Sequence, residues 1–147
     1  MPASPLAPDY SGFGSTEQTA KMSSQGTFRR AAVVFTNKAP APLPAFSQAI
    51  KANNMVYVSG NVGIDPATGK LQEGVAAQTT QILKNLKAVL EEGGSGLDKV
   101  IKVNVFITDM GKFAELNKAY FGVFEEPQPV SALPFEAEVE MECQALL

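Results

Sequence analysis

The 147-residue sequence contains no histidine and a single cysteine, Cys143. The absence of histidine excludes imidazole acid–base catalysis and any metal site with histidine ligands. A lone cysteine cannot form an internal disulfide or a cysteine-rich metal site, and it weakly favours a reducing compartment. Any chemistry must therefore use carboxylates, amides, hydroxyls, lysine, backbone groups or water, and we predict no metal and no cofactor.

Basic charge and long apolar runs are also scarce. Twelve lysines and arginines stand against fifteen acidic residues, which gives a net charge of −3 and a pI near 5.0. Nucleic-acid binding needs a basic face, so no nucleic-acid partner is expected. No apolar run reaches the roughly 20 residues that a membrane span needs, so no membrane partner is expected either. The composition is otherwise that of one globular domain.

Residues 1–30 differ from the rest of the chain and are predicted to form a disordered extension. They are rich in proline, serine, glycine and threonine and show no apolar periodicity. From Met22 to Ala39 there is no acidic residue, whereas Arg29 and Arg30 are basic. This composition is typical of a mitochondrial transit peptide, but a plain flexible tail is the favoured interpretation. The location is therefore expected to be cytoplasmic or mitochondrial, with a globular domain over residues 31–147.

Hydrophobic periodicity predicts the elements of this domain. Short strands are expected over Ala32–Thr36, Gln48–Lys51, Met55–Ser59 and Val100–Ile107. Asn53-Asn54 and Asp65–Gly69 have the composition of turns. The last strand has the clearest alternation, with one face made of Ala137, Val139, Met141, Cys143 and Ala145.

Two helices separate these strands. The first is predicted from Val75 to Leu90 and is stopped by Gly93-Gly94; the second is predicted from Gly111 to Phe124, behind an N-cap at Thr108 or Asp109. The order of elements predicts an α+β fold, a mixed β-sheet covered on one face by two helices. Apolar residues also occur on the other face, so we expect a homo-oligomer.

Several motifs, in fixed order over about residues 33–147, resemble those of the RidA/YjgF family. Ala39-Pro40 followed by Phe46-Ser47-Gln48-Ala49-Ile50 resembles the opening A-P…P-Y-S-Q-A-I. The stretch from Tyr57 to Gly69 resembles V-S-G-Q-[IV]-x-[IV]-D-P-x-T-G. Further matches are Gln78-Thr79, Asn85–Glu91, Val103–Met110, Asn117–Tyr120 and Leu133–Glu142.

The resemblance implies a chorismate-mutase-like fold that assembles as a homotrimer, with three sites at the clefts between subunits. It also implies a reaction, the hydrolysis of small imines or enamines such as 2-aminoacrylate and 2-iminobutanoate to 2-keto acids and ammonia. In the family an arginine pairs with the carboxylate of the substrate. A glutamate near the last strand and backbone groups position the attacking water.

Five positions match residues of the family's cleft. Glu140 corresponds to the glutamate and is the predicted catalytic residue; the predicted substrate-binding residues are Phe46, Ser59, Gly60 and Asn117. Phe46 stands where a tyrosine is usual. Each position also has a simpler interpretation. Glu140 is one of four glutamates on a solvated strand face, Asn117 can cap a carbonyl, and Ser59-Gly60 can be a strand end and turn. Phe46 is favoured as a core residue, and Cys143 as a small buried hydrophobe.

The sequence departs from the family between Pro129 and Val130. The family segment P-x-R-[ST]-C-V is missing, although both flanks match, which removes roughly six residues or about 20 Å of extended chain. The substrate-anchoring arginine is lost with it, and the only arginines left are Arg29 and Arg30. The gap is expected to shorten an interior strand and to weaken the sheet beside it.

Three hypotheses follow from the gap. The chain is an imine deaminase impaired by the missing arginine, or it is a non-catalytic trimer that acts as a binding, chaperone-like or regulatory module. Alternatively, the gap arises from splicing or from a wrongly assigned exon boundary. A ribonuclease role ranks last, because a histidine-free acidic chain offers no suitable acid–base pair.

Overall fold

The computed structural model describes residues 31–124, 130–132 and 139–147. The main sheet has the order β1-β2-β3-β8-β6-β7, and all neighbours are antiparallel except the parallel pair β6 and β7. The predicted mixed sheet is confirmed. Its strands are β1 (Ala32–Val34), β2 (Ala49–Ala52), β3 (Met55–Asn61), β6 (Val100–Phe106), β7 (Val130–Ala132) and β8 (Glu140–Leu146).

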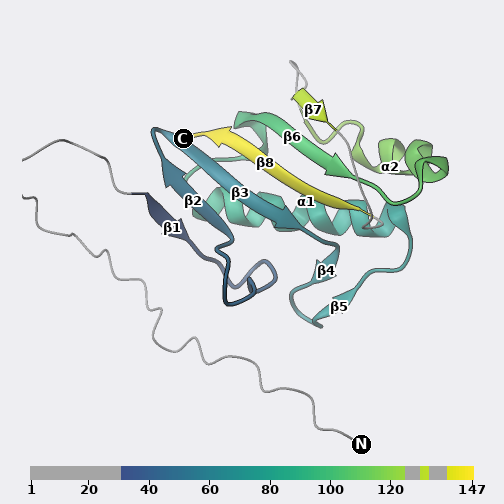
Figure 1. The fold of residues 1–147 in the computed structure, drawn as a ribbon, viewed down its shortest axis with the longest axis horizontal. Helices are drawn as coiled ribbons and strands as arrows, with labels where there is room; N and C mark the ends of the chain where they lie inside the picture. Colours follow the sequence, from purple (N-terminus) through teal and green to yellow (C-terminus); the bar gives the residue numbers. More distant parts are fainter. Residues whose placement is uncertain (1–30, 125–129, 133–138) are drawn as a thin grey trace, which may run out of the picture.

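Helix α1 (Val75–Glu92) runs across one face of this sheet, and α2 (Phe113–Tyr120) packs against α1 (Figure 1). Two short 3-10 turns, η1 (Leu97–Lys99) and η2 (Met110–Lys112), precede β6 and α2. The core lies between the helices and the sheet. Val58, Cys143 and Val103 are cross-strand neighbours on β3, β8 and β6, and all three are buried. The predicted α+β fold, with its helices on one face of a sheet, is therefore confirmed.

Two predicted boundaries need correction, and one predicted turn is confirmed. β1 ends at Val34 and not at Thr36, because the side chain of Gln48 binds the backbone N–H and carbonyl of Thr36. α2 ends at Tyr120 and not at Phe124, because the chain turns extended at the next residue and Gly122 has a φ of 80°. The predicted turn over residues 65–69 lies inside a small hairpin. Its strands, β4 (Ile64–Asp65) and β5 (Lys70–Leu71), are too short to show a period.

The two longest strand predictions are largely confirmed. Met141, Cys143 and Ala145 of β8 and Val139 just before it are buried as predicted, and Ala137 lies outside the described residues. Val103 and Val105 of β6 and Ile107 just after it are buried, but Ile101 is 45% exposed. A register shift between Val100 and Lys102 places Val100, and not Ile101, in the core.

Local turn and cap signals are confirmed where the sequence was specific. Asn53 and Asn54 have φ values of 50° and 62°, the left-handed geometry expected of a tight hairpin. The carbonyl of Asn54 accepts a hydrogen bond from the N–H of Leu147 at 3.1 Å, so the C-terminal strand is tied to this turn. Asp109 caps η2 by accepting from the N–H of Gly111 at 2.8 Å.

The shortened segment lies at an edge of the described sheet. β7 is the last strand in the sheet order and pairs with β6 over residues 102–104. The prediction that the gap shortens an interior strand is therefore wrong in this arrangement. Shortening an edge strand removes backbone hydrogen bonds to one neighbouring strand only. The central strands β3, β8 and β6 stay paired with one another. Pro129, on the other side of the gap, lies outside the described residues.

The face of the sheet opposite the helices carries apolar and polar side chains in one cross-strand row. The register places Val33, Ile50, Tyr57, Gln144 and Lys102 directly opposite one another on five strands. Val33 is 63% exposed and Tyr57 is 40% exposed. The expected apolar residues on the uncovered face are therefore present, and this surface is called the open face below.

Cys143, in β8, behaves as the predicted buried hydrophobe. Burial, with a smaller contribution from the neighbouring Glu142, raises the pKa of its thiol from 9.0 to about 12. Burial also raises the pKa of Tyr120 from 10.0 to about 12, with a contribution from Cys143. Both groups therefore favour the protonated form in the folded chain.

Alkaline pH is expected to destabilise the fold through these two groups. Above pH 9 the unfolded chain loses protons that the folded chain retains, so the free energy of unfolding should fall between pH 9 and about 12. Urea unfolding followed by circular dichroism at stepped pH measures this slope. A Cys143→Ala variant should show a shallower decline, and an identical slope in both proteins would contradict the assignment to Cys143.

Candidate active site

Ser59 and Gly60 lie in a β-bulge of β3. In the β3–β8 register Val58 pairs with Cys143, and the next pair is Asn61 with Met141, so β3 has one residue more than β8 at this point. Such bulges bend a strand and redirect its side chains, and they are frequent beside active sites. The simpler interpretation of Ser59-Gly60 as a strand end and turn is wrong, because both residues lie within β3.

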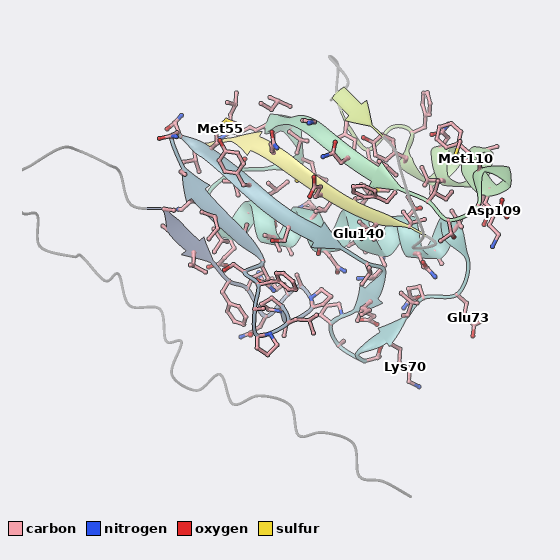
Figure 2. The ribbon with its side chains drawn as sticks, in the orientation of Figure 1. Met55, Lys70, Glu73, Asp109, Met110 and Glu140 are labelled. Atoms are coloured by element: carbon pink, nitrogen blue, oxygen red, sulfur yellow. The ribbon has the colours of Figure 1, made fainter. Side chains whose placement is uncertain are left out.

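Glu140 begins β8 on the open face, half-buried, opposite Phe106 of β6. Its carboxylate lies over Gly60. An ideal Cβ built on Gly60 would overlap Glu140 Oε1 and lie 2.8 Å from Cδ, so any side chain at position 60 would require this carboxylate to move. Figure 2 shows Glu140 where the start of β8 meets the end of β3. Two predicted site residues, 80 positions apart in the sequence, are thus brought into contact.

Ser59 connects this pair to the loop before β2. Its hydroxyl donates a hydrogen bond to the carbonyl of Ser47 at 2.6 Å, and its N–H donates to the carbonyl of Gln48 at 3.0 Å. Phe46 is the next residue along this loop and is 66% exposed. Its interpretation as a core residue is therefore wrong. Its ring is available on the surface, next in sequence to a residue that binds Ser59.

Asn117 is not joined to the other predicted residues by any contact that the structure describes. It lies in α2 directly after the buried Leu116, and its side chain is half-buried. Its carbonyl accepts from the N–H of Phe121 at 2.8 Å, at the end of the helix. α2 packs on the helix side of the sheet, whereas Glu140 is on the open face. The role of Asn117 in ligand binding therefore stays a prediction.

A second feature of the open face was missed by sequence reasoning. A hollow of about 320 Å³ is lined on its polar side by Tyr57, Ser59, Lys102, Asn104, Glu142 and Gln144. Asn104 donates a hydrogen bond to the Glu142 carboxylate, and Lys102 forms no ion pair with any residue in the described ranges. Ser59 lines this hollow and directly precedes Gly60 in β3, whereas Gly60 and Glu140 are not among the lining residues. The sequence alone could not show that these residues lie together, because their grouping depends on the register between β6 and β8.

The chemistry that these residues offer is that of carboxylates, hydroxyls, amides and one ammonium group. Within residues 31–124 and 139–147, no three histidine, cysteine, aspartate or glutamate side chains gather in a way that would hold a metal ion. The missing guanidinium has no substitute of its own kind there, because Arg29 and Arg30 lie outside the described residues. No helix of the described part is long and apolar enough to cross a membrane.

Similarity to known proteins agrees with this arrangement. Residues 36–147 match the family model described as Endoribonuclease L-PSP. The chain is 43% identical to Reactive Intermediate Deaminase A, chloroplastic, of Arabidopsis thaliana over 122 residues, which cover 78% of this chain and 65% of the relative. It is 40% identical over 119 residues to Protein MMF1, mitochondrial, of Saccharomyces cerevisiae, covering 77% and 82%.

The fold is shared with solved structures as well. The crystal structure of RidA from the Antarctic bacterium Psychrobacter sp. superposes with a TM-score of 0.74 at 38% sequence identity, and the match covers 79% of this chain and 99% of that one. Family model, sequence identity and fold agree over most of the chain. The chain belongs to the Endoribonuclease L-PSP family, which includes the RidA reactive intermediate deaminases.

Proposed function

We propose that the chain hydrolyses small reactive imines or enamines, of the 2-aminoacrylate and 2-iminobutanoate class, to 2-keto acids and ammonia. The observation that carries the proposal is the Glu140 carboxylate held over Gly60 at the bulge of β3. A Reactive Intermediate Deaminase A among its relatives supports the same reaction class. No cofactor is needed, because a protonated imine is already an electrophile.

In this reaction Glu140 orients a water molecule and accepts one of its protons. The water oxygen bonds to the imine carbon and the C=N π electrons move to nitrogen, which gives a carbinolamine. Glu140 then gives this proton to nitrogen. As the C–N bond breaks and ammonia leaves, the carbinolamine hydroxyl forms the C=O bond and returns its proton to the Glu140 carboxylate. Gly60 contributes space, because its missing side chain lets the carboxylate lie against the strand. General-base assistance of this kind typically accelerates a reaction by about 10²–10⁴-fold.

The substrate carboxylate lacks its family partner. A buried bidentate arginine–carboxylate contact is worth about 2–5 kcal/mol when one partner is removed, which corresponds to roughly tenfold to a few thousandfold in rate or affinity. This loss supports the alternative function, a non-catalytic binding or regulatory module of the same fold. We place the protein in the cytoplasm or the mitochondrion, which the mitochondrial relative from yeast supports.

We also propose that three copies assemble through the open face. Val33 and Tyr57 expose apolar surface there, and the half-buried ammonium of Lys102 has no described counter-ion. A neighbouring copy would cover this apolar surface and supply a carboxylate to the Lys102 ammonium. The Gly60–Glu140 pair lies at the end of the same face, so assembly would enclose it in a cleft between subunits.

Two substitutions test the catalytic pair. Glu140→Gln removes the base and Gly60→Ala displaces the carboxylate, so each should lower kcat for freshly generated 2-iminobutanoate by about 10²-fold or more. Circular dichroism verifies folding, and Glu92→Gln, at an exposed position at the end of α1, is the control. A wild-type rate in Glu140→Gln would remove Glu140 from the mechanism.

Restoring the family segment P-x-R-[ST]-C-V between Pro129 and Val130 tests the role of the missing arginine. The restored chain should hydrolyse 2-iminobutanoate about tenfold to a few thousandfold faster than the natural chain. Equal rates would show that another group holds the carboxylate. No acceleration by either chain would favour the non-catalytic module.

Assembly is tested by multi-angle light scattering. The wild-type protein should have about three times the 15.6 kDa mass of one chain. Tyr57→Asp places a charge on the open face, at a position that is 40% exposed in the single chain, and should give monomers that remain folded. A monomeric wild-type protein would contradict the proposed trimer.

A further inference from the structure

The side chain of Gln48 is a buried polar group that the proposed mechanism does not use. It is 6% exposed and lies at the end of the proline loop, defined here as residues 35–47 between β1 and β2. Its Oε1 accepts from the N–H of Thr36 at 2.7 Å, and its Nε2 donates to the carbonyl of Thr36 at 3.0 Å. The same Nε2 reaches the carbonyls of Ala39 and Pro40 at 3.4 and 2.9 Å.

This amide takes the place of a peptide group in the sheet. The β1–β2 ladder ends where Val34 pairs with Ala49. Beyond that point Gln48 gives Thr36 both the donor and the acceptor that a strand partner would have supplied. The first turn of the loop is thereby fixed without a strand, at the position where the sequence predicted one.

The backbone of Gln48 fixes the other end of the loop. Its carbonyl accepts from the N–H of Ser59, and the carbonyl of Ser47 accepts from the hydroxyl of Ser59. One residue therefore ties the start of the loop through its side chain and the end of the loop to the bulge strand through its backbone. Compact loops closed at both ends in this way often carry functional groups.

Phe46 lies near the end of the proline loop that these hydrogen bonds hold closed. Its N–H donates to the carbonyl of Leu43 at 2.9 Å in a turn, and its ring is 66% exposed. Through Ser47 and Ser59 the loop end adjoins Gly60, against which the Glu140 carboxylate rests. An exposed aromatic ring beside a small polar site is suited to contact the hydrocarbon part of a bound imine.

We infer that Gln48 is a positioning residue that holds the proline loop so that the ring of Phe46 forms the rim of the Gly60–Glu140 site. The part that concerns substrate affinity rests on the proposed function. The part that concerns the order of the loop that carries the ring does not, because it is argued from the hydrogen bonds of Gln48, which need no substrate.

The first experiment follows the ring without any activity. The chain contains three tyrosines but no tryptophan, so Phe46→Trp introduces a single indole at the end of the loop, which can be excited selectively at wavelengths that tyrosine does not absorb. Adding Gln48→Met removes all four side-chain hydrogen bonds at similar volume and should lower the fluorescence anisotropy of the introduced indole. Gln78→Met is the matched control, since Gln78 is a 4% exposed glutamine that donates to the carbonyl of Gln72 instead. It should leave the anisotropy unchanged.

A second variant covers the case in which Gln48→Met does not fold. Gln48→Glu keeps an acceptor for the N–H of Thr36 and loses the donations to the three carbonyls, so it should lower the anisotropy as well. Anisotropy equal to that of the parent in the folded Gln48 variants would overturn the inference, whatever the activity of the protein.

The second experiment is a double-mutant cycle on 2-iminobutanoate hydrolysis. If the ring contact is worth what aromatic contacts usually contribute, Gln48→Met should raise KM about two- to tenfold. In a Phe46→Ala background it should raise KM no further, because the group it positions is already absent. A full additional rise in that background would show that Gln48 does not act through Phe46. Absence of hydrolysis by the wild-type chain would count against the proposed function only, and the anisotropy result would then decide the inference.

Discussion

Strand β8 is paired on both sides, and the alternation of its residues constrains the rest of the molecule. Met141, Cys143 and Ala145 enter the core, where each is at most 3% exposed, and they fix the register of β3 and β6. A slip by one residue would turn Glu140 and Glu142 into that core at the cost of burying unpaired charge. The apolar half of β8 thus places its carboxylates on the open face.

The bulge in β3 brings Gly60 next to the Glu140 carboxylate and so forms the candidate site. With a regular ladder, the residue of β3 opposite the start of β8 would carry a side chain toward the open face. The extra residue between Val58 and Asn61 brings Gly60 under the Glu140 carboxylate. In the proposed reaction this position would let the carboxylate orient a water molecule beside the strand. Strand pairing and a missing side chain together achieve this.

The sequence predicted the helix–sheet fold because its elements bury regular faces. The alternation of apolar and polar residues predicted β8 and most of β6. The helical spacing of apolar residues predicted α1 almost to its last residue. Features set by single side chains were not predictable in this way. The end of β1 depends on the amide of Gln48, and the exposure of Ile101 depends on a register shift that no period encodes. The hairpin β4–β5 has too few residues to show a pattern.

The predicted site residues show the same contrast between what sequence patterns indicate and what depends on the pairing of strands. Glu140 and Gly60 were selected through family motifs, and pairing across β3 and β8 brings them together. Periodicity alone would have assigned Glu140 to a solvated face. The substrate-binding role of Phe46 stays a prediction, but its favoured interpretation as a core residue was wrong, since hydrophobicity does not reveal a loop that exposes its ring. Lys102 and Glu142 were not selected, because they share a hollow only through the register of distant strands.

The missing arginine is an electrostatic problem as much as a positional one. Glu140 and Glu142 both lie on the open face of an acidic chain. A substrate carboxylate about 4 Å from one such charge would be repelled by roughly 1 kcal/mol in water and roughly 4 kcal/mol at an effective dielectric constant of 20. A guanidinium cancels this repulsion while it orients the substrate. In the proposed reaction the carboxylate that would activate water would also oppose the binding of an anionic imine, and a cation on the open face, from Lys102 or from a neighbouring copy, would offset that repulsion.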